Sequence, residues 1–89
     1  STSAVTYPAA TGANQTLLAA NAARRGFQVV NDSANILYVK FGATATTSSY
    51  TIRMAPNAVY DHREGTIWTG IIDAIMSAGT GNIAVTEMT

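Results

Sequence analysis

The 89-residue chain has no cysteine, and it is poor in charge, proline and histidine. Without cysteine it can form neither a disulfide nor a thiolate metal site. Only 11% of its residues are charged, against about 25% in a typical soluble domain, and five basic residues balance five acidic ones. Because no basic surplus is present to neutralise phosphates, we expect no nucleic-acid partner.

Long apolar segments are also missing. No run approaches the ~20 residues that span a bilayer, so we expect no membrane partner. The stretch STSAVTYPAATG has neither the basic nor the apolar segment of a signal peptide. We therefore expect synthesis in a cytoplasm without export.

The apolar content that is present is light. Hydrophobic residues make up 47% of the chain, but sixteen are alanine and only eighteen are valine, isoleucine, leucine or phenylalanine. Burial of a large aliphatic side chain stabilises a fold by about 1.5–3 kcal/mol, and alanine contributes far less. We therefore expect one small domain with a thin core, stabilised by an oligomer interface or by docking onto a larger body.

Turn-forming residues interrupt short apolar segments about every ten residues, which is typical of an all-β domain. Alternation is clearest at Leu37, Val39 and Phe41, which should face one side of a strand. The pattern predicts a small antiparallel β-sandwich or barrel of about seven or eight short strands. No strand–helix–strand rhythm occurs, which excludes a doubly wound α/β fold.

Two segments near the N-terminus have ambiguous patterns. Residues 1–14 predict an N-terminal arm that lies on a neighbour, with an edge strand or disorder as alternatives, and residues 15–89 form the domain. Within the domain, 15–25 favours a strand at Gln15–Ala19 followed by a loop. A short helix ending before Gly26 is the alternative.

The segment VVNDSANILYVKFG, residues 29–42, reads as a β-hairpin with a cluster of turn formers at its centre. The polar side chains from Asn31 to Asn35 could offer oxygens to a cation. Side chains of this type more often bond the backbone of their own turn, which is the interpretation we favour.

Candidates for chemistry are few. The only ionisable cluster is DHREG at 61–65, with the single histidine, His62, and it predicts a solvent-exposed turn with local ion pairs. One histidine and scattered acids do not supply a metal site. The basic pair Arg24-Arg25 has no aromatic platform close in sequence, and no nucleophile motif occurs. We expect no catalytic, cofactor-binding or metal-binding residues, and no enzymatic activity.

Exposed apolar side chains are the better candidates for function, because aromatics and methionine are enriched at interface cores. Trp68 could equally belong to the core, and Trp68 or Tyr60 could stack on a sugar ring if two coplanar rings were exposed. The candidate interface residues are Val5, Tyr7, Tyr60, Trp68 and Met88.

Residues 17–87 resemble a small protein of tailed bacteriophages and prophages. Each shared motif is short, and it is their order along the chain that is specific. Two positions depart from the family pattern, since Ala22 stands where proline is usual and Asn57-Ala58 where two glycines are usual. The motifs are Ala20-Asn21-x-x-Arg24, Asn31-x-Ser33, Leu37-Tyr38-Val39-Lys40, a loop of Ala, Thr and Ser, Ala55-Pro56, Tyr60-Asp61, Thr69-Gly70-x-Ile72 and Val85-Thr86-Glu87.

The resemblance implies a β-sandwich virion component without enzymatic activity or cofactor. Among virion components, we first expect a capsid decoration (cement) protein, bound to the outside of the shell. We expect it to be a homo-oligomer, and specifically a trimer. The partners would be other copies and the major capsid protein or another virion protein. A tail, neck or head-fibre component is the alternative, and a glycan-binding module on the virion surface is another.

Overall fold

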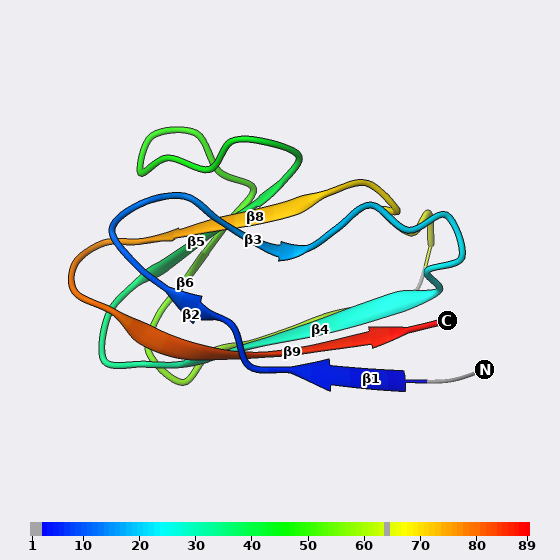
Figure 1. Cartoon of the computed structure of the whole chain (residues 1–89), viewed down its shortest axis with the longest axis horizontal. Helices are drawn as coiled ribbons and strands as arrows, with labels where there is room; N and C mark the ends of the chain where they lie inside the picture. Colours follow the sequence, from blue (N-terminus) through cyan, green and yellow to red (C-terminus); the bar gives the residue numbers. More distant parts are fainter. Residues whose placement is uncertain (1–2, 64) are drawn as a thin grey trace.

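The computed structural model describes residues 3–63 and 65–89, which form two antiparallel β-sheets packed face to face (Figure 1). The all-β sandwich expected from the sequence is therefore confirmed. No helix occurs in these ranges, and so none that could cross a membrane. The strands are β1 (Ser3–Thr6), β2 (Ala9–Ala10), β3 (Gln15–Leu18), β4 (Gly26–Asp32), β5 (Leu37–Phe41), β6 (Ile52–Met54), β7 (Val59–His62), β8 (Ile72–Met76) and β9 (Gly81–Met88).

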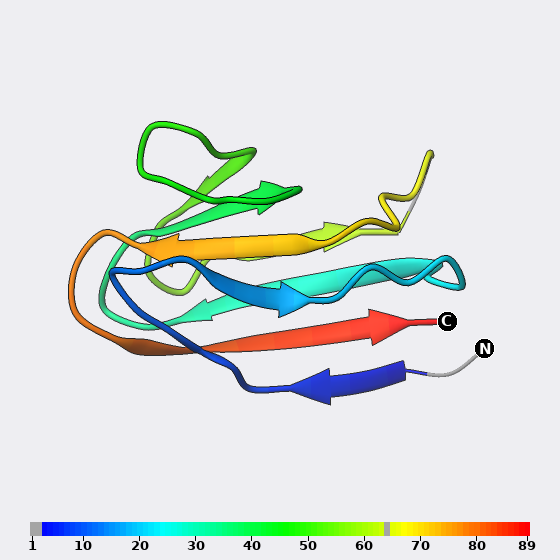
Figure 2. The ribbon, with the colours of Figure 1, turned by 45° about the horizontal axis from the view of Figure 1, so that its top comes forward.

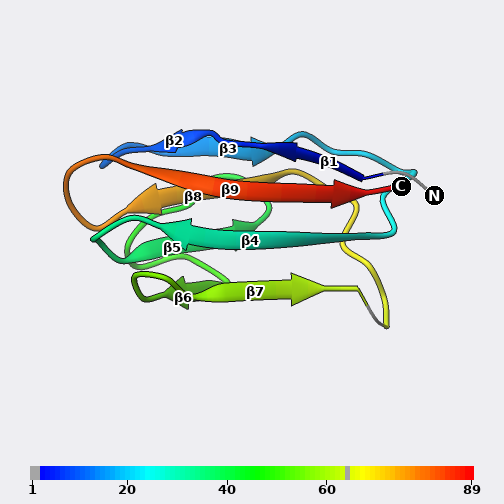
Figure 3. The ribbon, with the colours of Figure 1, turned by 90° about the horizontal axis from the view of Figure 1, so that it is seen from below.

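Sheet A has five strands in the order β1-β9-β4-β7, with β2 also pairing to β9, and sheet B has the order β3-β8-β5-β6. In Figure 3, β1 and β7 form the two opposite borders of sheet A. Each neighbouring pair in this order is antiparallel. Because three antiparallel pairings separate them, β1 and β7 also run antiparallel to each other.

The core lies between the sheets and follows the predicted alternation. Phe27 and Val29 of β4 are fully buried, while Gln28 between them is half-buried on the outer side. Alternation along β5 buries Leu37 and Val39 in the same way, with Phe41 packed at the margin. The buried cluster is Ala10, Leu17, Phe27, Val29, Leu37, Val39, Met54, Ile72, Ala74, Met76, Ile83 and Val85.

The hairpin expected at residues 29–42 is wrong. β4 pairs with β7 and β9 in sheet A, whereas β5 pairs with β6 and β8 in sheet B. Figure 2 shows the chain leaving β4 and rising into the other sheet. The turn formers of this segment fix a reversal of direction, but they do not fix the pairing partner. In this fold the turn connects β4 of sheet A to β5 of sheet B.

Two further expectations concern the N-terminal part of the chain. The segment after Asn14 forms β3, so the strand-and-loop prediction is confirmed and the helix alternative is wrong. Of the expected arm, Ser1 and Thr2 lie outside the described residues, while β1 and β2 both pair with β9 of the same chain. These two short strands, separated at Tyr7-Pro8, bring the described strands to nine.

The charged turn expected at 61–65 begins later than expected. Asp61 and His62 belong to β7, where they pair with Gln28 and Phe27 of β4. The alternation of Val59, Tyr60, Asp61 and His62 continues the strand past the tyrosine, because the aromatic and imidazole rings both face the core. Glu64 lies outside the described residues.

Candidate functional site

The most exposed large hydrophobic side chains gather at the two edges of sheet A. Tyr7 is 69% exposed, Val59 57% and Val5 51%, whereas Tyr50 and Trp68 stand at 42% and 37%. Val5 lies on β1, Tyr7 directly follows that strand, and Val59 begins β7. The least covered apolar groups are therefore at the two borders where the sheet could be extended.

The β1 edge is uncharged from Ser3 to Tyr7. Its inner side pairs with β9, and in the described part of the chain no strand lies beyond it. Val5 pairs with Thr86 and therefore shares the outer face of sheet A with that residue. Natural edge strands are commonly protected by lysine, proline or a bulge, and here the only such device is Pro8, after the strand has ended.

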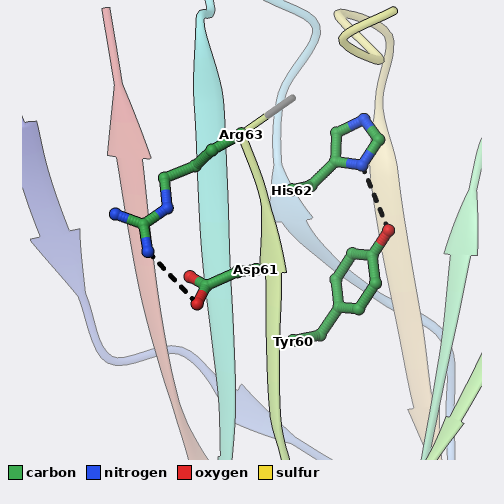
Figure 4. A pocket seen from close by; sticks show the side chains of 4 residues that line it. All are labelled: Tyr60, Asp61, His62 and Arg63. Carbon is green, nitrogen blue, oxygen red and sulfur yellow. Dashed lines mark hydrogen bonds and ion pairs between the residues drawn. The ribbon is translucent and has the colours of Figure 1, made fainter. Parts of the chain in front are cut away.

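A surface hollow lies beside the β7 edge. A hollow of about 400 Å³ is lined by Tyr60, Asp61, His62 and Arg63, four consecutive residues. Figure 4 shows Tyr60 and His62 on one side of the strand and Asp61 and Arg63 on the other. Since successive strand residues face opposite sides, a space touched by all four lies along the free backbone edge.

Charged groups in the hollow are already paired with each other. Asp61 accepts a hydrogen bond from Gln28 Nε2 at 3.0 Å, and Arg63 Nη2 lies 3.3 Å from its second carboxylate oxygen. The expected local ion pair is thus present, although it lies on the outer face of sheet A. Asp61 therefore points away from His62 and cannot orient its ring (Figure 4).

His62 uses both ring nitrogens within the fold. Its Nε2 accepts the Trp68 backbone N–H at 3.2 Å, and its Nδ1 lies 3.1 Å from Tyr60 Oη. An Nε2 that accepts a hydrogen bond carries no proton, which places the proton of the neutral ring on Nδ1. The ring also packs against Phe27 and Phe41, with centroids 5.0 and 5.4 Å apart. These contacts give His62 a structural role, since both of its ring nitrogens and its ring faces are engaged within the fold.

Trp68 is part core and part surface. Its indole lies nearly parallel to the Phe41 ring, with centroids 6.3 Å apart, and its Nε1 donates to Ile71 O at 2.9 Å. Tyr60 leans on Phe27 and Phe41. The rings of Trp68 and Tyr60 thus both pack against aromatic residues of the fold. These contacts do not support the alternative in which the two rings stack on a sugar.

The five predicted interface residues do not form one surface. Val5 and Tyr7 lie at the β1 edge, and Met88 ends the neighbouring strand β9, where it pairs with Ser3. Tyr60 lies at the β7 edge, and Trp68 donates its backbone N–H to a β7 side chain. The structure divides them between the two opposite borders of sheet A and adds Val59, which is 57% exposed and is not among the predicted interface residues.

Arg24 is a polar centre that the sequence reading missed. Its side chain is fully buried, and Nε donates to Glu87 Oε2 at 2.8 Å. The other guanidinium nitrogens donate to the carbonyls of Ala19, Trp68 and Gly70 at 2.7–3.0 Å. The guanidinium also lies 5.8 Å from the ring centroid of Phe27, so the expectation that the basic pair has no aromatic platform close in sequence is wrong.

Asn31, near the C-terminal end of β4, is a second buried polar residue. Its Nδ2 lies 2.9–3.1 Å from the carbonyls of Asn35, Met54 and Ala55, and its Oδ1 accepts from Ser33 Oγ. The expectation that this turn's side chains bond the local backbone is confirmed. Asn31 also reaches β6, which the sequence could not show.

Asp73 is the third buried polar residue, and the sequence presents it only as one of its scattered acids. It lies on β8 and is 2% exposed. Its carboxylate accepts from Thr16 Oγ1 at 2.9 Å and from Asn14 Nδ2 at 3.1 Å. Asn14 also accepts the backbone N–H of Ala45, which ties the loop after β5 to sheet B. These contacts make Asp73 a structural anchor.

No group of three or more potential metal ligands occurs within residues 3–63 and 65–89. Comparison of the chain with protein-family models, with curated proteins and with solved structures gives no significant match. The resemblance to small virion proteins therefore stays a prediction, and function has to be argued from the geometry above.

Proposed function

We propose that the chain is a non-enzymatic structural protein of a tailed-phage virion, and specifically a capsid decoration protein that stabilises the shell as a homo-oligomer. The observation that supports this proposal is the pair of open edges of sheet A. The three most exposed large hydrophobic side chains, Val5, Tyr7 and Val59, all lie there. An uncovered strand edge with apolar side chains is a template for pairing with another chain.

The phage assignment depends on the order of the shared motifs along the chain. The buried polar contacts support it, because they join residues of different motifs. Arg24, Gly70 and Glu87 belong to three separate motifs, and the Arg24 guanidinium contacts both of the others. Asn31 likewise contacts Ala55 of the Ala-Pro turn. The motifs thus meet in space as structural contacts, as expected of a family defined by its fold.

The test is binding of the purified chain to phage shells prepared without a decoration protein. The proposal predicts saturable co-sedimentation with shells and a higher temperature or denaturant concentration for shell disruption. A chain that binds isolated tails or necks and leaves shells unbound would contradict the capsid assignment and favour the tail or neck alternative. Saturable binding to bacterial surface polysaccharide without binding to any virion part would favour the glycan alternative.

A further inference from the structure

We infer that copies of this chain assemble by continuing sheet A from one molecule to the next, with β1 of one copy seated along the β7 edge of its neighbour. The inference rests on the proposed function, since it specifies the surfaces by which the homo-oligomer forms. It commits to a second copy of this chain as the occupant of the β7 hollow.

Strand direction permits this continuation. β1 and β7 lie at opposite borders of sheet A and run antiparallel to each other. When copies are related by rotation about an axis parallel to the strands, β1 of one copy arrives antiparallel to β7 of the next. The pairing pattern of the sheet then continues unbroken across copies. Such a head-to-tail contact closes into a ring when the rotation angle allows it.

The two edge strands have equal lengths and compatible charges. β1 and β7 have four residues each. The side chains from Ser3 to Tyr7 carry no charge, while the charges at the β7 edge, Asp61 and Arg63, are paired with each other. An uncharged strand can therefore approach β7 without leaving a new unpaired charge. The hollow of about 400 Å³ provides room along the backbone edge of β7.

The faces of the two strands fix which registers are possible. Val5 lies on the outer face with Thr86, and Val59 and Asp61 lie on the outer face opposite Val30 and Gln28. Odd-numbered residues of β1 must then stand opposite odd-numbered residues of β7, because a shift by one residue would turn every side chain to the wrong face.

One permitted register covers the whole hollow. It lays Ser3–Thr6 along the residues from Tyr60 to Arg63, with Val5 opposite Asp61. The same register places Tyr7 opposite Val59, the two most exposed large hydrophobic residues, at 69% and 57%. Aromatic and β-branched residues opposite each other are a favourable cross-strand pair.

Cysteine pairs provide the test, because the chain has no cysteine of its own. The single variants Val5→Cys and Asp61→Cys are mixed in equal amounts and oxidised mildly. The mixed 5–61 dimer, identified by mass, should be the main covalent product. Within one chain the two positions are three strand spacings apart, about 14 Å, too far for a disulfide. Val5→Cys mixed with Val59→Cys, two residues out of register on the same face, should cross-link much less.

Tyr7→Cys with Val59→Cys is a second pair in the same register, in case the first pair disturbs folding. A main product of 5–5 dimers would overturn the inference in favour of self-pairing of β1. An unmodified chain that is oligomeric by native mass, yet gives neither the 5–61 nor the 7–59 bridge, would also overturn it while leaving the proposed function standing. A chain that is monomeric by native mass and also ignores shells would overturn both.

Discussion

Arg24 shows how one side chain can hold three separated segments together. Its guanidinium is fully buried and donates to Ala19, to the Trp68–Gly70 segment and to Glu87. Arginine suits this position because its rigid fork of donors satisfies several acceptors at once. A buried charge of this kind is stabilising only while all of its partners remain in place.

Replacing Arg24 should therefore be costly. We expect Arg24→Met to lower the free energy of unfolding by about 3–5 kcal/mol, because Glu87 and three carbonyls lose their donor. Denaturant unfolding gives the value. Arg25→Met, at the exposed neighbouring position, is the control and should change stability by no more than about 0.5 kcal/mol. Equal stability of the two variants would contradict the role assigned to Arg24.

Gly70 is required by the close approach of the tryptophan. A Cβ added there would lie 2.5 Å from Trp68 Cζ2. We expect Gly70→Ala to displace the indole and to destabilise the fold by about 1–3 kcal/mol through overpacking. The emission of the single tryptophan should shift toward that of a more solvated indole. Gly12→Ala, with no heavy atom within 4 Å of the added Cβ, should leave emission and stability unchanged. An unaltered spectrum for Gly70→Ala would contradict this packing.

Buried polar residues were the part of the structure least accessible from the sequence. The sequence presents Arg24 as half of a basic pair and as part of a motif, and Asp73 as one of its scattered acids, with no partner for either side chain. Their partners, Glu87 and Asn14, lie 63 and 59 residues away along the chain. Local patterns describe which residues are apolar and how they alternate, and they carry no information on contacts across such separations.

At the scale of elements, the strands were predicted well and their pairing less well. Period-2 alternation located β5, because one face of that strand lies in the core. The same alternation is compatible with a hairpin and with a connection between sheets. The partner was decided by long-range pairing with β9 and β8 and by the contact of Asn31 with β6.

The connection between sheets should depend on the amide of Asn31. Asn31→Asp has nearly the same shape but places an oxygen against the carbonyls that Nδ2 now contacts. We expect a loss of about 1–3 kcal/mol or more in unfolding free energy, since buried acceptors would face each other without a proton. Asn82→Asp, at an exposed position of β9, is the matched control. Equal effects of the two substitutions in denaturant unfolding would argue against this view.

The β1 edge should tolerate changes that the assembly does not. Val5 is 51% exposed, so Val5→Glu should leave the monomer folded. In the inferred register it would face Asp61 of a neighbour, and we expect association to weaken tenfold or more, equivalent to about 1.4 kcal/mol. Adding Asp61→Lys should restore much of this loss. Thr80→Glu, in the exposed turn before β9, should have no effect on native mass, and a similar loss there would exclude a specific edge contact.

The whole molecule is a sandwich with a light core and two open edges on one of its sheets. β1 begins and β9 ends at the same end of the sandwich (Figure 1). The many alanines and the low charge predict a fold that depends on neighbours, and this stays a prediction; the sequence could not show that the exposed apolar residues would gather on opposite borders. That arrangement follows from the strand order, which only the complete fold defines.

The most direct test of the account is the native mass of the purified chain over a dilution series, with and without phage shells. Assembly through the edges of sheet A, together with capsid binding, predicts one closed oligomer that persists on dilution, loses unfolding stability when it finally dissociates, and co-sediments with shells. A monomer at every concentration, with unchanged stability and no binding to shells, would contradict it.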